Sequence, residues 1–259
     1  MGRFLVSLPI WVSGAILILG IPALMVVALL LIRRAFPALR TTGHNDVAAG
    51  LMTLVGVIYA VVAGFTTIDQ LGNYTEVRDD VRQQAFDLAV LATGSRTMGP
   101  AAHREIQDAV IAYNRAVIDE WPRLTRGMSS PRVEREHRRL LGSVADLRPV
   151  TDPQRAFVDD GTARLMQAGV DRLHLLYDAR HGHLEGAVWA SLLMASAVTL
   201  LFCLLFGIEN ARLAYLMVAG VGAIIAINLF LMVQLNYPLA GDLSVPPESF
   251  RQVVAELTR

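Results

Sequence analysis

The chain has 259 residues, 54% of them hydrophobic and 18% charged, and its 23 basic and 23 acidic residues give a formal net charge of zero. This composition is too apolar for an average soluble domain, and the charge balance excludes an overall field that favours nucleic acid. A single cysteine, Cys203, excludes an intrachain disulfide. We therefore expect a membrane protein with one water-exposed portion.

Four apolar stretches are each long enough to cross a bilayer. They cover residues 4–32, 47–68, 187–208 and 213–235, and no charged or histidine side chain interrupts them. About 20 apolar residues span the roughly 30 Å hydrocarbon layer as a helix. The first stretch exceeds the length of a cleaved signal core, so we expect it to be retained. The sequence thus predicts an all-α integral membrane protein with four transmembrane helices.

A charged segment between spans two and three is predicted to be a helical soluble bundle. Ser130 and Asp152 each precede a proline, which is typical of a helix N-cap, and no proline follows Pro153 until Pro238, so the last helix would run unbroken into the third span. The apolar stripes at helical spacing are Val77, Val81, Ala85, Leu88 and Ala92; Ile106, Val110, Tyr113, Val117, Trp121 and Leu124; and Val158, Leu165, Val170, Leu173 and Tyr177. The predicted domains are a first helix pair (1–68), the bundle (69–185), a second helix pair (186–236) and a tail (237–259).

The arginines of the short loops predict the orientation. Arg33, Arg34 and Arg40 follow the first span, and Arg212 lies between the third and fourth. Because positively charged short loops stay in the cytoplasm, we expect the bundle and both termini outside it.

Small residues at four-residue spacing mark the second and third spans, where they let helix backbones approach closely in lipid. Two interpretations of the second span remain open. Its small residues pack within the chain, or the span lines the axis of an oligomer with a hydrophobic constriction. The residues concerned are Gly56, Ala60 and Gly64 for the small row and Ile58, Val62 and Phe65 for the constriction; the third-span row is Ala187, Ser191, Ala195, Thr199 and Cys203.

Polar side chains within the spans are few. Asn228 and Gln234 lie in the fourth span, where we expect each amide to bond to a neighbouring helix rather than to form an ion path. Asp46, with His44 and Asn45, is expected to cap the second span.

His174, Asp178, His181 and Glu185 are spaced to share one helical face. We interpret them as a solvated face, with an ion or pH-sensitive site as the alternative. No catalytic motif occurs, so we expect no catalytic residue, cofactor or metal, and no enzyme; a membrane enzyme would have to use this face.

The chain resembles the bestrophin-like family of bacterial and plant membrane proteins. The residues that carry the resemblance are Asn45-Asp46, Gly56, Tyr59 and Gly64-Phe65; Tyr113 and Glu120-Trp121-Pro122; and, most specifically, Asn236-Tyr237-Pro238-Leu239-Ala240-Gly241 with Val245, Pro247 and Phe250. The resemblance implies an anion-permeable homo-oligomeric channel, a pentamer in true bestrophins. It also implies a cytoplasmic bundle, opposite to what the loop charges predict.

Two functions follow as hypotheses. The first is a multi-pass protein of the bacterial inner membrane that forms a homo-oligomeric ion channel for small anions, in contact with lipid and not with nucleic acid. The alternative is a membrane-anchored sensor or scaffold whose bundle binds a ligand or a protein partner.

Overall fold

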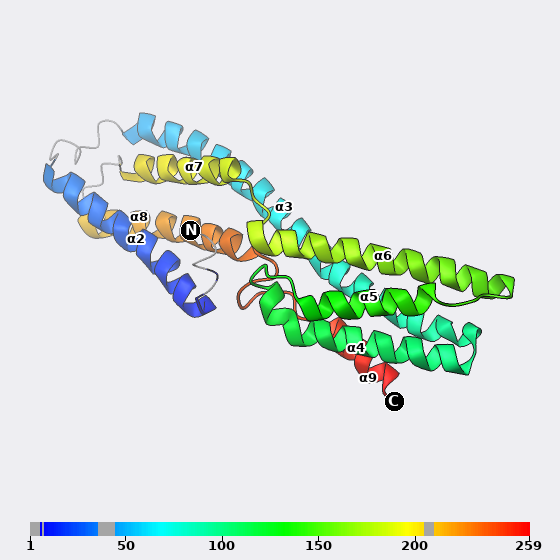
Figure 1. Ribbon diagram of the computed structural model, residues 1–259. Helices are drawn as coiled ribbons and strands as arrows, with labels where there is room; N and C mark the ends of the chain where they lie inside the picture. The colour runs from blue at the N-terminus through cyan, green and yellow to red at the C-terminus, as the bar shows by residue number, and fades with distance from the viewer. Residues whose placement is uncertain (1–5, 7, 36–44, 205–209) are drawn as a thin grey trace. The chain divides into compact units, whose positions relative to one another are not determined.

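The computed structural model describes residues 6, 8–35, 45–204 and 210–259, and the regular structure within these ranges is entirely helical (Figure 1). The all-α prediction is confirmed. Arg40, His44 and the side chains of Asn45 and Asp46 lie outside the described part, and the predicted cap with them. The helices in chain order are α2 (Ile10–Ala35), α3 (Asn45–Gly94), the 3-10 helix η3 (Ser95–Met98), α4 (Pro100–Leu124), α5 (Pro131–Ala145), α6 (Asp152–His181), α7 (Gly186–Leu204), α8 (Ala211–Leu235) and α9 (Glu248–Leu257).

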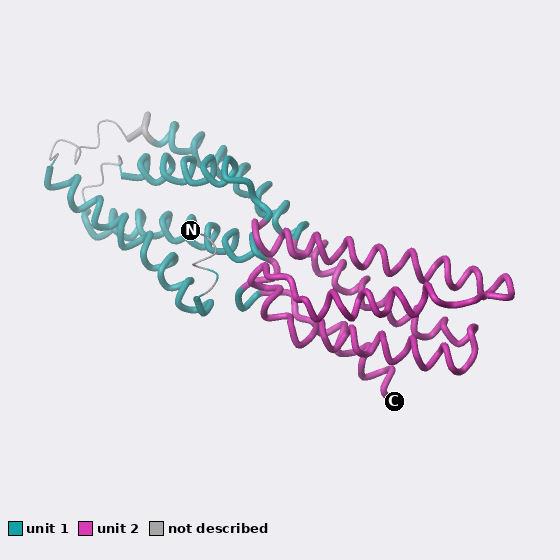
Figure 2. The backbone as a smooth tube through the Cα atoms, viewed as in Figure 1, with its two compact units in different colours: residues 1–73, 183–237, 241–243 teal, residues 74–182, 238–240, 244–259 magenta. Residues whose placement is uncertain are grey.

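The chain divides into two compact units (Figure 2). The first contains residues 1–73, 183–237 and 241–243, and the second contains residues 74–182, 238–240 and 244–259. Helix α3 contributes its first part to one unit and its last part to the other.

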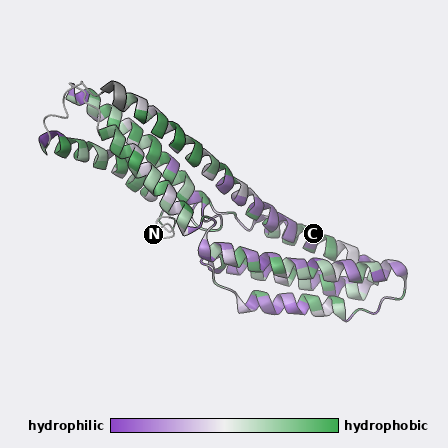
Figure 3. Cartoon of the chain, turned by 90° about the horizontal axis from the view of Figure 1, so that it is seen from above, coloured by the Kyte–Doolittle hydropathy of each residue, from purple (hydrophilic) through white to green (hydrophobic). Residues whose placement is uncertain are grey.

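The first unit, which we call the membrane unit, contains the apolar helices that are long enough to cross a membrane. Its helices α2, α7, α8 and the first part of α3 supply four candidate spans, and Figure 3 shows the hydrophobic residues along them. Where α2 and α8 meet, a Cβ added to Gly222 would lie 3.3 Å from the Cα of Pro22, so the missing side chain permits this close approach. Two buried clusters hold the unit together: Met25, Leu29, Cys203, Leu204, Ala214 and Val218; and Tyr59, Ala63, Leu192, Ile225, Leu229 and Met232.

The second unit is a helical bundle with a continuous apolar core from α3, α4, α5, α6 and α9. The predicted stripes of α3 and α4 are buried, which confirms them. Ser130 caps α5, since its side chain accepts a hydrogen bond from the Val133 N–H at 3.4 Å. At α6 the cap is Thr151 rather than Asp152, and Gln154 closes this turn by accepting from the Thr151 N–H at 3.2 Å.

The predicted buried face of α6 is wrong in part. Leu165 is buried, but Val170, Leu173 and Tyr177 are exposed. The face that packs inward combines three small residues with three large ones: Gly161, Ala168 and Ala179, and Leu165, Arg172 and Leu175. Gly161, Ala168 and Ala179 let α6 approach its neighbours closely. The positions of the large apolar residues alone therefore do not predict which face of α6 is buried.

The predicted continuous helix into the third span is also wrong, because α6 ends at His181. Gly182 adopts a positive φ of 72°, which suits glycine at a helix end. The N–H groups of His183 and Leu184 then donate to the backbone oxygen and to Oδ1 of Asn236, at 3.1 and 2.7 Å. These bonds replace the helical ones that the chain gives up, and α7 starts at Gly186.

Candidate functional site

The first part of α3 is apolar on almost every side but packs within the chain on only one. Tyr59 and Ala63 are buried against α7 and α8, whereas Ile58, Val62 and Phe65 are 55%, 39% and 70% exposed. At 100° per residue these last three lie within about 60° of one another on the helix. They form one uncovered apolar face, which we call the open face.

The small residues of α3 lie on a different side of the helix. The 100° step places Gly56, Ala60 and Gly64 roughly opposite the open face. Gly56 and Ala60 line a hollow of about 380 Å³ that α7 and α8 complete. A Cβ added at Gly56 or Gly64 would meet no described atom within 4 Å, in contrast to Gly222. The six predicted residues therefore form two surfaces rather than one.

The row of small residues in the third span changes its surroundings along α7. Ala187 and Ser191 are exposed, while Thr199 and Cys203 are buried. Cys203 packs in the cluster that joins α2, α7 and α8. Only the later part of this row therefore serves packing within the chain.

Both predicted intramembrane amides have a partner on a neighbouring helix, as the sequence predicts. Asn228 lines the hollow and donates from Nδ2 to Thr67 Oγ1 on α3 at 3.4 Å. Gln234 donates to Ser13 Oγ on α2 at 3.2 Å, and both of these residues are buried. These bonds cross-link the helices of the membrane unit.

Asn236 is the polar centre of the membrane unit. Its buried side-chain oxygen accepts from Gln70 Nε2 at 3.3 Å and from the Leu184 N–H at 2.7 Å, so it joins α3 to the start of the α7 segment. Five residues later, Gly241 has a φ of +80°, and a Cβ there would lie 2.8 Å from Val6. The segment that carries the family resemblance thus contains a buried hydrogen-bonding residue, Asn236, and a position, Gly241, where a side chain would clash. Sequence reasoning gave Asn236 no role, although an asparagine directly after an apolar span was a usable signal.

The predicted face around His174 is not formed as expected. His174, Asp178 and His181 lie on α6, but Glu185 follows the helix end at His181 and cannot share their face. His181 stacks on Tyr177 instead, with ring centroids 4.4 Å apart. Within the described ranges no three side chains of the metal-ligating types are grouped to hold an ion.

Near this face, Asp80 of α3 lies among other acids. Burial raises the pKa of Asp80, and Asp171 and Glu76 raise it further, while His174 acts in the opposite direction. The α3 and α6 surface therefore carries concentrated negative charge, which His174 partly offsets.

Comparison with known sequences decides the family. The family model of the bestrophin-like domain matches residues 19–250, nearly the whole chain. The chain belongs to the bestrophin-like family. This confirms the resemblance that Asn236–Gly241 and the other quoted residues indicate. No curated protein matches the chain.

Solved structures share the bestrophin-like fold. A single-residue variant of a bacterial bestrophin homolog from Klebsiella pneumoniae matches with a TM-score of 0.72, over 95% of this chain and 96% of that chain, at 16% identity. The structure of this homolog phased with zinc gives a TM-score of 0.70 over 93% and 96%, at 15% identity. A variant of a membrane protein gives 0.71 over 93% and 97%, at 14% identity. These likenesses, with the four apolar helices, identify a bestrophin-like membrane protein.

Proposed function

We propose that the chain is one subunit of a homo-oligomeric channel that conducts small anions, and that the open face of α3 lines its axis. The uncovered apolar face of α3 carries this proposal. Apolar side chains repeated by symmetry around an axis form a constriction that excludes water until it widens. Ile58, Val62 and Phe65 would form successive rings of this constriction.

Exposure to lipid alone would also leave the open face uncovered, so a second surface supports the proposal. On α6, in the charged second unit, Met166, Val170, Leu173 and Tyr177 form an exposed apolar stripe, and Leu173 is 66% exposed. The spacing of three and four residues places them on one side of the helix. A stripe of this kind on a water-exposed bundle is typical of a protein interface. We assign it to contact with a neighbouring subunit.

The choice of anions rests on the bestrophin-like family. Residues 49–68 of α3 include no charged side chain, so the constriction itself does not select the sign of an ion. The resemblance to bestrophins implies anion permeation, and it also supports a multi-pass location in a cell membrane, which we propose to be the bacterial inner membrane.

The test combines the mass of the assembly with its conductance. We expect the purified protein in detergent to have the mass of a closed oligomer, and reconstituted bilayers to show anion currents. V62A/F65A should increase the current, because smaller side chains widen and hydrate the constriction, whereas L216A, an exposed apolar position of α8, should leave it unchanged. A monomer without conductance would remove the channel and leave the sensor or scaffold hypothesis.

The side of the membrane that holds residues 69–185 stays a prediction. The loop charges predict that this segment lies outside the cytoplasm, whereas the family resemblance implies that it lies inside. Labelling of single cysteines introduced at exposed positions such as Arg104 and Arg115, in a C203S background, distinguishes the two.

A further inference from the structure

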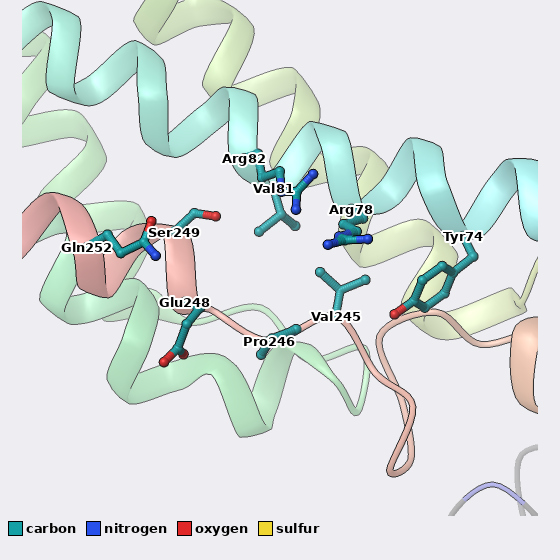
Figure 4. Close-up of a pocket in the computed structure, with 9 residues that line it drawn as sticks. All are labelled: Tyr74, Arg78, Val81, Arg82, Val245, Pro246, Glu248, Ser249 and Gln252. Carbon is teal, nitrogen blue, oxygen red and sulfur yellow. The ribbon is translucent and has the colours of Figure 1, made fainter.

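A polar cavity of about 410 Å³ lies between α3 and α9 in the second unit (Figure 4). Small-molecule sites in proteins occupy roughly 300–1,000 Å³, so this cavity is large enough for a small ligand. Tyr74, Arg78 and Arg82 line it from α3, and Ser249 and Gln252 line it from α9. None of these residues belongs to the open face or to its surroundings.

The cavity carries positive charge that the chain neutralises only in part. Arg78 and Arg82 are four residues apart on α3, so their side chains share one side of the helix, where like charges repel. Arg82 pairs with Asp79 at 3.4 Å, but both side chains are more than half exposed, and such pairs are weak. The guanidinium group of Arg78 has no ion pair or hydrogen bond with any residue that the structure describes. An anion between the two guanidinium groups would relieve their repulsion.

The acidic residue that lines the cavity does not fill this role. Glu248 Oε2 pairs with Arg251 Nη1 at 2.9 Å, and Figure 4 shows its carboxylate directed away from Arg78 and Arg82. Neutral donors complete the lining, since the hydroxyl of Ser249 and the amide of Gln252 have no hydrogen-bond partner among the described residues. The cavity therefore offers two cations and two neutral donors.

We propose that this cavity binds a phosphate-bearing ligand, held by Arg78 and Arg82 with Ser249 and Gln252 as neutral donors. The planar guanidinium group presents paired N–H groups that match two phosphate oxygens, and two arginines match the double charge of a phosphomonoester. Two sources of the phosphate group fit this chemistry. One is a small soluble phosphorylated molecule, and the other is a lipid headgroup. A headgroup is a candidate because Asp69 is the first charged residue after the apolar stretch of α3, and Arg78 follows it by nine residues, about 14 Å along the helix.

The first arm of the test uses inorganic phosphate as the probe. Thermal unfolding of the full-length protein in detergent is followed as sodium phosphate replaces sodium gluconate at constant ionic strength. We expect a saturable rise in the melting temperature, and R78Q/R82Q should weaken the apparent affinity about tenfold or more. R104Q/R115Q removes the same charge from exposed positions of α4 outside the cavity and should respond as the native protein does.

The second arm tests a lipid source. The same proteins are placed in nanodiscs of phosphatidylcholine, with and without phosphatidylglycerol. A rise in melting temperature that needs phosphatidylglycerol and is lost in R78Q/R82Q assigns the site to a headgroup, while a response to free phosphate alone assigns it to a soluble ligand.

The proposal is overturned if R78Q/R82Q and R104Q/R115Q behave alike in both arms. If R78Q/R82Q does not fold, R78K/R82K keeps the charge but loses the paired donors and should retain only a weakened response. The readout is binding, so the outcome does not depend on whether the protein conducts ions.

Discussion

The two units differ in how many large apolar side chains they leave exposed. In the membrane unit Ser13, Gln70, Gln234 and Asn236 are buried, while Phe65 and many large apolar residues are exposed. The second unit exposes fewer large apolar residues and buries rings such as those of Tyr113 and Phe250, and polar side chains such as Asn114 are buried in it as well. The difference reflects the solvent: water drives apolar surface inward, whereas lipid leaves hydrogen bonds and close backbone packing to hold helices together. An exposed large apolar side chain is therefore expected in the membrane unit but needs an explanation in the second unit.

Two aromatic residues give the sharpest test of this comparison. F250A removes a fully buried ring from the second unit and should cost about 3–5 kcal/mol in the free energy of unfolding. F65A removes an exposed ring from the membrane unit and should change stability by less than about 0.5 kcal/mol. Unfolding by heat or denaturant in detergent measures both. Because the proposed constriction would bury Phe65 between subunits, the two variants are compared as separated monomers, and equal losses there would contradict the prediction.

The polar centre of the membrane unit gives the next largest effect. N236A removes the acceptor of Gln70 Nε2 and of the Leu184 N–H, and buried donors left without partners cost about 1–3 kcal/mol. N228A removes one long hydrogen bond of 3.4 Å and should cost less than about 1 kcal/mol. The same unfolding assay compares them. A smaller loss for N236A than for N228A would show that Asn236 is not the polar centre of this unit.

Arg172 is a buried charge in the second unit, and its replacement should stabilise the protein. The side chain is 7% exposed, its Nη1 has no partner, and burial lowers its pKa. R172M should raise stability by about 1 kcal/mol, because it removes a buried charge and keeps the volume. R164M is the matched control and should destabilise, since Arg164 pairs with Asp87 and Asp160. A loss of stability in R172M would reveal an anionic partner of Arg172.

The smallest expected effect is a pH dependence from His137. Burial, and then the charge of Arg172, lower the pKa of His137 below 6.5. Below that pH the unfolded chain binds a proton that the folded chain resists, so stability should fall on acidification from about pH 6.5. H137Q should flatten this part of the profile of melting temperature against pH. An unchanged profile in H137Q would assign the dependence to other groups.

The sequence predicted what local pattern determines. Length and hydropathy located the four spans, and regular spacing located the buried faces of α3 and α4. At α6 it identified Leu165 but missed Leu175, because Gly161, Ala168 and Arg172 share the buried face and interrupt the apolar pattern.

Distant residues decide the remaining features. The helix break at Gly182 depends on hydrogen bonds to Asn236, and the cavity joins Arg78 to Ser249 across most of the chain. No local pattern contains this information. For α3, the prediction treated six residues as one face, whereas the structure places them on two sides of the helix.

The hydrogen bond between Gln70 and Asn236 can form only after the last span has been synthesised. Its partners are 166 residues apart, so a ribosome that adds about 5–20 residues per second completes Asn236 on the order of ten to thirty seconds after Gln70. During that interval the amide of Gln70 has no permanent acceptor. The early helices therefore lack this cross-link until the last span has been synthesised. Truncation before Asn236 should leave them more susceptible to degradation by membrane proteases.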